Sequence, residues 1–443
     1  MTIRVKHTAL AVLVLSAGLS SMHRVSAGDR PAPVTVDKRA VGAFNAIELA
    51  GPFRVIVSEG APRLELSGEP RQLTEIETEV RNGTLVVRQR SRNSFGIHWG
   101  RREHAEVVVR IGATGLKSLS NSGSGDVELE SIGAERFVLN SQGPGDIRAR
   151  GGVRELNVTS SGSGDVDLRQ VKASNVALTL SGPGDVRLGA VGNDLSARMS
   201  GSGDLEAMDL RLTRAVAQIS GPGNAKLRGS ARELRAELTG SGELDACEMQ
   251  VEKVSSLQRG AGNACVAGNI RQFEAEVNGS GDLEARGLQA GRAVLRMNGP
   301  GNATLTGTAD ELRADLNGSG ELDAAGLTVK NALIDSGGPG NVSLARVTDT
   351  LDASLHGSGD LSATVEGKRV LLKMRGPGNV QLDGRAERIS AELMGSGSLQ
   401  ARRLTVRQTD INVRGPGSAT VNQVRDGGGE LVQVERGGRR QTN

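Results

Sequence analysis

The phrase SGSGDVD at residues 161–167 returns as SGPGDVR at residues 181–187, with Pro in place of the central Ser. The chain carries sixteen copies of this Gly-x-Gly pattern, each followed by a polar residue. The first glycines of the copies are Gly123, Gly143, Gly162, Gly182, Gly201, Gly221, Gly240, Gly260, Gly279, Gly299, Gly318, Gly338, Gly357, Gly376, Gly395 and Gly415. Ser and Pro alternate at the centre, with Ala261 as the one substitute. Because the intervals alternate between 20 and 19 residues as far as Gly357, the sequence unit is about 39 residues long.

Between the turns, apolar and polar side chains alternate. Leu234, Ala236 and Leu238 precede Gly240, for example, and each is separated from the next by one polar residue. A period of two residues predicts strands with one buried face. The glycines on both sides of the central residue are expected to supply the positive φ that a reversal between strands requires.

Two strands and two turns in about 19 to 20 residues predict one coil of a parallel β-solenoid. Neighbouring coils stack about 4.8 Å apart and supply one another's ladder hydrogen bonds. A single coil has only about five inward side chains, too few to offset its backbone entropy, so the coils must fold as a stack. The alternative is one coil for each complete sequence unit, with Ser turns on one edge and Pro turns on the other. Such a coil would have a perimeter of about 130 Å, and no strand pattern is long enough to form its sides.

The remaining segments define the expected domains. Residues 1–27 combine a basic head, an apolar run and small residues before Gly28, which predicts a secretory signal peptide. The apolar run of about 14 residues is shorter than the roughly 20 that a membrane anchor needs, and no later segment predicts a span. We expect a linker at 28–40, an N-terminal β cap with the first coils at 41–111, the solenoid at 112–423 and a Gly- and Arg-rich tail at 424–443. The cap is needed because an uncovered first coil would offer an open strand edge.

Composition argues against several functions. The chain has 62 Gly, five Phe, one Trp and no Tyr, so its core must be thin and aromatic stacking platforms are not expected. Residues 1–27 hold three basic residues and no acid, so their removal lowers Lys+Arg from 54 to 51, equal to Asp+Glu. A neutral chain with interspersed charges gives no reason to expect a nucleic-acid partner. The Gly-x-Gly turns lead into strands rather than helices, which excludes phosphate loops.

Three parts of the sequence together resemble a known family. They are FNAIELAGPFRVIVSEG at 44–60, RNGTLVVRQR at 81–90 and the serial SGSGDV and GPGDV turns. These residues are similar to the bacterial head GIN domain family, described as the heads of auto-transporter adhesins, over roughly residues 41 to 420. The resemblance implies a right-handed β-helix and a role in adhesion at a surface. It supplies no catalytic residues.

One segment departs in composition from the rest of the chain. Residues 92–104 read RNSFGIHWGRREH and lie between two strand patterns. This segment gathers Phe95, His98, Trp99, Arg101, Arg102 and His104. It is a candidate binding loop, because loops carry binding residues more often than strands do. The alternative is a flap whose Phe and Trp cover the end of a narrow core.

A row of acids follows five successive turns. Its members are Asp126, Asp146, Asp165, Asp185 and Asp204. On coils of about 20 residues they are expected to form a column with a spacing of about 4.8 Å, where repulsion must be met by water, protonation or a cation. The column is therefore a candidate calcium site, and a solvated edge is the alternative. Later in the chain Asn alternates with the acids, which separates carboxylates by about 9.6 Å and adds a hydrogen-bond donor.

The two cysteines, Cys247 and Cys265, lie on successive predicted coils, two positions apart in register. An exported chain meets an oxidising environment, which favours a disulfide. The strand spacings predict a Cα separation of about 8 Å, beyond the usual limit of about 7 Å. The disulfide is therefore a candidate, and free cysteines are the alternative.

These observations predict an exported adhesion, interaction or scaffolding protein without an active site, located in the periplasm, at the cell surface or outside the cell. The expected partner is a cell-surface or envelope component, either protein or glycan. No cofactor is expected apart from the candidate calcium. The alternative is a polysaccharide-acting β-helix enzyme, for which the mark would be a cleft lined by acids and Arg that breaks the repeat.

Overall fold

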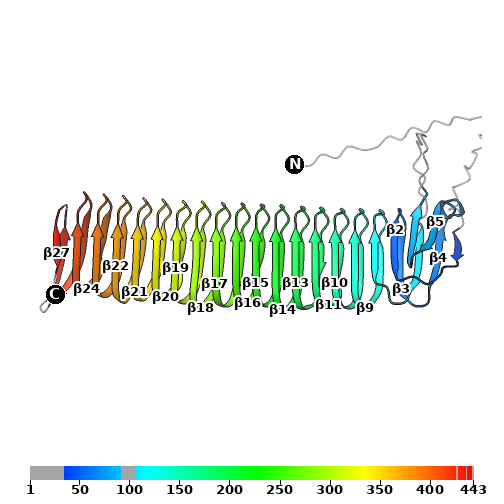
Figure 1. The fold of residues 1–443 in the computed structure, drawn as a ribbon, viewed down its shortest axis with the longest axis horizontal. Coiled ribbons are helices and arrows are strands. Elements are labelled where there is room, and N and C mark those ends of the chain that lie inside the picture. The colour runs from blue at the N-terminus through cyan, green and yellow to red at the C-terminus, as the bar shows by residue number, and fades with distance from the viewer. Residues whose placement is uncertain (1–33, 91–105, 426–427, 436, 442–443) are drawn as a thin grey trace, which may run out of the picture.

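In a computed structural model, the chain forms a parallel β-solenoid of about 15 turns (Figure 1). The structure describes residues 34–90, 106–425, 428–435 and 437–441, so the predicted signal peptide lies outside the described residues. Stacked neighbours such as Asp204 and Asn224 are 20 positions apart, and Asn224 and Glu243 are 19 apart. The short coil is thus confirmed, and the alternative of one coil for each complete sequence unit is excluded.

The stack is built from strands that follow one another along the rod axis in chain order (Figure 1). They are β9 (Val127–Ser141), β10 (Ile147–Ser160), β11 (Val166–Leu180), β12 (Val186–Leu188), β13 (Val191–Met199), β14 (Leu205–Ile219), β15 (Ala225–Leu238), β16 (Leu244–Gln258), β17 (Ala264–Val277), β18 (Leu283–Met297), β19 (Ala303–Leu316), β20 (Leu322–Ser336), β21 (Val342–Leu355), β22 (Leu361–Met374), β23 (Val380–Leu393), β24 (Ser398–Val413) and β25 (Ser418–Arg425). Most coils are one continuous strand that bends between two Gly turns, rather than the two separate strands expected.

Strand β14 illustrates how one coil bends around the core. Its buried side chains are Leu205, Ala207, Leu210, Leu212, Ala215, Ala217 and Ile219. The prediction of about five inward side chains was therefore too low. Two outward residues in succession separate Ala207 from Leu210 and Leu212 from Ala215, and at these two places the strand can change direction while both flanks stay inward. Phe137 and Phe273 are also buried, so neither offers an outward ring.

The Gly turns owe their glycines to close stacking. A Cβ on Gly240 would overlap the carbonyl oxygen of Gly221 and would lie 2.5 Å from that of Ser220. The second glycine of each turn meets its counterpart one coil earlier in the same way. The predicted positive φ at these turns is wrong, because the positive-φ glycines of the described residues, such as Gly229 and Gly307, lie elsewhere in the coil.

The longer coils contain one residue more than the shorter coils. The extra residue lies at the first bend after the Gly turn. Ala207 pairs with Leu227 and Leu210 with Gly229, so three steps of β14 lie against two steps of β15. This is a β-bulge. Gly229 completes the shorter corner at φ 130°, a conformation that favours glycine. Because the bulge restores the register, the turns stack in line although coil lengths alternate.

The N-terminal cap contains more structure than expected. Its elements are β1 (Thr35–Arg39), β2 (Ala46–Ala50), β3 (Arg54–Glu59), β4 (Arg63–Gly68), α1 (Pro70–Leu73), β5 (Ile76–Arg81), β6 (Thr84–Gln89), β7 (Val108–Ala113) and β8 (Ser118–Asn121). Strands β5 and β6 form a hairpin that reverses at Asn82 and Gly83. Part of the expected linker is strand β1, which pairs antiparallel with β4. With four residues, α1 is too short to cross a membrane, and no longer apolar helix occurs in the described residues.

The first turn of the stack is Gly51-Pro52-Phe53, which the sequence analysis missed. Strands β2 and β3 flank it and pair parallel with β8 and β9. A Cβ on Gly123 would overlap the carbonyl oxygen of Gly51, so this turn stacks like the others. Phe53 replaces the second glycine, which hid the turn from a Gly-x-Gly search.

The C-terminal end is capped too. Strand β26 (Gly428–Val434) pairs antiparallel with β25, and β27 (Arg439–Gln441) pairs antiparallel with β24. The expected Gly- and Arg-rich tail is therefore largely strand. Antiparallel strands cover the edge that the last parallel coil would otherwise expose.

Candidate interaction surface

The residue after each Gly turn belongs to one row along the rod, here called the turn column. Its members are Asp126, Asp146, Asp165, Asp185, Asp204, Asn224, Glu243, Asn263, Asp282, Asn302, Glu321, Asn341, Asp360, Asn379, Ser398 and Ser418. The structure brings all five calcium candidates into this row. The backbone N–H of Asp146 donates to Oδ1 of Asp126 at 3.0 Å, and that of Asp165 donates to Asp146 at 2.9 Å. The same bond repeats at Asp185 and Asp204.

Two kinds of donor therefore compensate the charge of the column. Besides the backbone N–H groups, Arg187 lies 3.2 Å from Asp165 and 3.4 Å from Asp185. Sequence reasoning had considered water, protonation or a cation and missed both donors. Arg187 lies two residues after Asp185 in the sequence, so it could have been identified by examining that position after each acid of the column. Calcium binding by the column stays a prediction.

Asn residues extend this ladder as expected, whereas Glu residues interrupt it. Asn224 donates both its backbone N–H and its Nδ2 to Oδ1 of Asp204, at 2.7 and 3.2 Å. The N–H of Glu243 in turn donates to Oδ1 of Asn224 at 3.0 Å. Among the described hydrogen bonds, however, Glu243 accepts none from Asn263, because its longer side chain places the carboxylate out of line.

Two residues further along each coil lies a second row, here called the strand column. Its first members are Glu128, Arg148, Asp167, Arg187, Glu206, Lys226, Asp245, Cys265 and Glu284. Coils that begin with a Ser turn carry acids, and coils that begin with a Pro turn carry bases as far as Lys226. Neighbouring members can pair, since Lys226 lies 3.5 Å from Asp245. A hydrogen bond from Arg169 lowers the pKa of Asp167, and the same bond raises the pKa of Arg169.

A third row at the bend, here called the corner column, alternates in the opposite phase. As far as Glu311 its members are Arg136, Glu155, Asn175, Asp194, Arg214, Glu233, Lys253, Gln272, Arg292 and Glu311. Here the Ser coils carry the bases. Beyond Glu311 the row continues without the alternation, as Asn331, Thr350, Arg369, Arg388 and Gln408. Arg136 donates to Glu155 at 2.7 Å, and Lys253 lies 3.3 Å from Glu233. In these coils, opposite charges on neighbouring coils follow the two-coil period of the sequence and favour that pairing.

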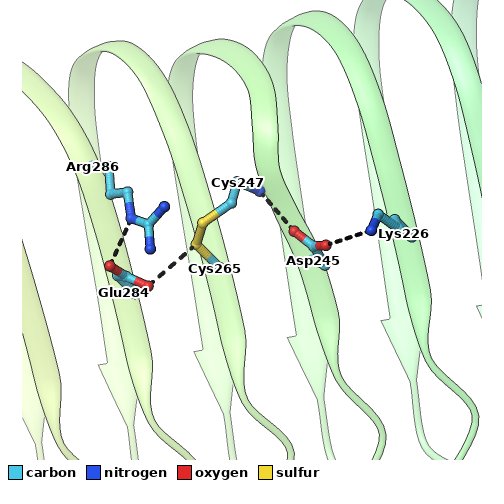
Figure 2. Close-up of a disulfide and its surroundings, with 6 residues drawn as sticks. All are labelled: Lys226, Asp245, Cys247, Cys265, Glu284 and Arg286. Carbon is cyan, nitrogen blue, oxygen red and sulfur yellow. Dashed lines mark hydrogen bonds and ion pairs between the residues drawn. A yellow bond between two sulfur atoms is a disulfide. The ribbon is translucent and has the colours of Figure 1, made fainter.

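Cys265 takes the place of a base in the strand column and forms a disulfide with Cys247 (Figure 2). Their Cα atoms are 5.2 Å apart, so the predicted separation, which exceeded the usual limit for a disulfide, is wrong. The ladder between β16 and β17 breaks its register after Ala246, and Cys247 lies at this bulge. The displaced backbone explains the shorter distance.

Charged side chains surround the disulfide on both sides (Figure 2). Asp245 accepts the N–H of Cys247 at 3.2 Å, and Glu284 lies 3.7 Å from Sγ of Cys265. Arg286 donates a hydrogen bond of 2.6 Å to Glu284. This hydrogen bond raises the pKa of the Arg286 guanidinium. In the part of the chain that the structure describes, Cys247, Cys265 and Glu284 form the one group of three potential metal ligands within 4.8 Å of one another.

From coil 299–317 onward, the strand column changes character. Its members there are Thr304, Asp323, Ser343, Ser362, Gln381, Gln400 and Thr420, and none is basic. An open groove of about 420 Å³, here called the polar groove, is lined by four of them, Ser343, Ser362, Gln381 and Gln400, and by Glu321, Asn341, Asp360 and Asn379 of the turn column. Its floor strands are β21 to β24. This change is visible only when successive coils are aligned in register, because the residues concerned are 19 or 20 positions apart in the sequence.

The candidate binding loop at 92–104 lies outside the described residues. This applies to Phe95, His98, Trp99, Arg101, Arg102 and His104 alike, so their role stays a prediction. His356, on the rod itself, lies 3.6 Å from Asp335 and far along the chain from the other candidates.

Comparison with known proteins gives one family match and several solved structures. The family model described as "Putative auto-transporter adhesin, head GIN domain" matches residues 43–208, 190–271, 267–364 and 347–428. A "putative adhesin" from Bacteroides fragilis is 20% identical, with a TM-score of 0.39 over 58% of this chain and 98% of its own. A "putative adhesin" from Parabacteroides distasonis is 15% identical, with a TM-score of 0.31 over 77% and 96%. A "Putative lipid binding protein" from the same species is 18% identical, with a TM-score of 0.24 over 83% and 96%. No curated protein matches.

Proposed function

The chain belongs to the head GIN domain family of auto-transporter adhesins, and we propose that it is an exported, non-catalytic adhesion protein. The observation that carries this proposal is the unbroken stack. Outward side chains of successive coils line up in rows from β9 to β25, and the turn column is a continuous row of carboxylate, amide and hydroxyl groups. Repeated rows suit multivalent contact with an extended partner, because each further contact adds to one already made.

The arrangement of the acids supports a non-catalytic role over the alternative of a polysaccharide-acting enzyme. An enzyme would need a cleft in which acids and Arg break the repeat. A groove of about 380 Å³ at the bend does contain acids and bases, namely Arg214, Arg232, Glu233, Glu252, Lys253 and Arg271. These residues lie 19 or 20 positions apart in two neighbouring rows, so they follow the repeat and do not break it, and Glu233 pairs with Lys253 at 3.3 Å.

The proposed partner is a component of a bacterial or host cell surface, either protein or glycan. The proposed location is the periplasm, the cell surface or the medium. Both rest on the family and on the sequence of residues 1–27, which predicts export.

A binding experiment tests this function. Purified 28–443 would be labelled and applied to bacterial cells, cultured host cells and an immobilised glycan panel, with heat-unfolded protein as the control. Saturable binding by the folded chain is expected. Release of reducing ends from a polysaccharide of the panel would instead support the enzyme, and the absence of saturable binding to all three surfaces would contradict adhesion.

A further inference from the structure

The strand-column side chains of the polar groove are available to an external partner. Those of Ser343, Ser362, Gln381 and Gln400 make no hydrogen bond to any other described residue of the chain, unlike that of Asn379, which accepts one from Ser398 at 2.8 Å. Hydroxyls and amides can both donate and accept hydrogen bonds. The groove therefore presents a row of unused donors and acceptors, one set on each coil.

The first half of the strand column offers a direct contrast on the same scaffold. There Glu128 pairs with Arg54 and Arg150, and Lys226 pairs with Asp245. Side chains that are already paired must give up a partner before they bind a ligand. The capacity for new hydrogen bonds is thus concentrated in the coils from residue 299 onward.

We propose that the polar groove binds a neutral, hydroxyl-rich polysaccharide chain lying along the rod axis. This inference rests on the proposed adhesive function and names its ligand class. Each sugar ring presents hydroxyls that donate and accept, which matches the amides and hydroxyls on successive coils. From Glu321 to Gln400 the groove crosses five coils and spans about 19 Å, so an oligomer fits and a single sugar would occupy a fraction of it.

The charge of the groove selects for neutral chains. Glu321 and Asp360, the two acids that line the groove, have no Lys or Arg partner among the described ion pairs, and neither the turn column nor the strand column holds a base from residue 299 onward. A polysaccharide rich in carboxylates would meet these two carboxylates without a compensating cation. Because the groove has no aromatic side chain, binding depends on many hydrogen bonds and should increase strongly with chain length.

The test compares two double variants on the same coils. Ser343→Val with Gln381→Leu removes groove hydrogen-bonding groups from coils 338–356 and 376–394. Ser354→Val with Ser390→Val is the matched control, because these residues lie outward on the second half of the same two coils. Affinity for immobilised dextran, mannan and xyloglucan, and for polygalacturonate of similar length, would be measured with each protein, together with cell binding.

We expect the parent and the control to bind at least one neutral polysaccharide, and the groove variant to bind it about tenfold more weakly. The groove is not the binding site if the two variants bind a neutral polysaccharide with equal affinity. The proposal is also wrong if the parent binds polygalacturonate as tightly as the neutral polysaccharides. If the parent binds cells but none of the neutral polysaccharides, the groove assignment fails while the adhesive function stands. Absence of binding to both cells and polysaccharides would overturn both.

Discussion

At the residue scale, the glycines of the turns show how stacking dictates identity. Sequence reasoning assigned them to positive φ, and the structure shows instead that a neighbouring backbone occupies the space of a Cβ. Identical turns on successive coils bring identical atoms together, so the restriction repeats at every coil. Gly291, where an added Cβ would meet nothing within 4 Å, is an example of a glycine without this restriction.

Alanine substitution separates these two kinds of glycine. Gly240→Ala places a methyl group against the Gly221 carbonyl, and overpacking of this kind costs about 1–3 kcal/mol. Gly291→Ala is the control, because a Cβ there meets nothing within 4 Å and the φ is not positive. We expect a lower urea midpoint for the first variant and an unchanged or higher midpoint for the second. Equal midpoints would show that the turns are not closely stacked.

The turn column supplies a second prediction at this scale. Glu321 accepts no bond from the N–H of Asn341, so Glu321→Asp should complete the ladder and raise the free energy of unfolding by about 0.5–1.5 kcal/mol. Asp282→Glu is the reciprocal change, because Asp282 now accepts from the N–H of Asn302 at 2.9 Å. Thermal unfolding of both variants measures the effect. If both substitutions shift the midpoint in the same direction, the ladder does not stabilise the stack.

The strand column makes stability depend on pH. The pKa of Asp167 is lowered in the folded chain, chiefly by its hydrogen bond from Arg169. The Asp167 carboxylate therefore stabilises the folded chain fully at pH values above the unfolded pKa of about 4. This stabilisation is lost as the pH falls through the lower pKa of the folded chain. We expect Asp167→Asn to destabilise by about 0.5 kcal/mol at pH 7 and by nothing measurable at pH 2. A difference that persists unchanged in urea titrations at pH 2 would contradict this role of the carboxylate.

At the scale of the element, the coil was predictable because its period of two residues holds along each straight stretch between the bends. The charge columns became visible only in register, since acids and bases that face each other, such as Glu206 and Lys226, lie on successive coils and are not neighbours in the sequence. The first turn was missed because Phe53 replaces a glycine. Strand β1 and the C-terminal strands were missed because they are antiparallel covers that do not share the repeat.

The disulfide is the covalent element that joins two coils. It closes a loop of 18 residues, for which the chain-entropy model gives about 3 kcal/mol of stabilisation. We expect a reducing agent to lower the melting temperature of the parent. The double variant Cys247→Ser with Cys265→Ser should melt at the lower temperature with or without reductant. Two free thiols per chain, measured by alkylation of the unreduced protein, would show that the bond does not form.

At the scale of the whole molecule, both ends are covered and the coils between them run without a break. The N-terminal cap protects the first coil with antiparallel strands, and β26 and β27 protect the last. Covered edges keep strand pairing within one chain, so adhesion must use the outward faces rather than the ends. The proposed function therefore depends on the protein being a single extended rod.

Small-angle X-ray scattering of 28–443 tests that claim most directly. Seventeen stacked turns, from Gly51 to Gly415, are separated by sixteen spacings of about 4.8 Å, which gives a rod of about 77 Å before the remaining cap strands are added. We expect a pair-distance distribution with an early maximum, set by the narrow cross-section, and a long tail that extends beyond that length. A symmetric distribution typical of a compact particle, or one that resolves into separate beads, would contradict the continuous solenoid.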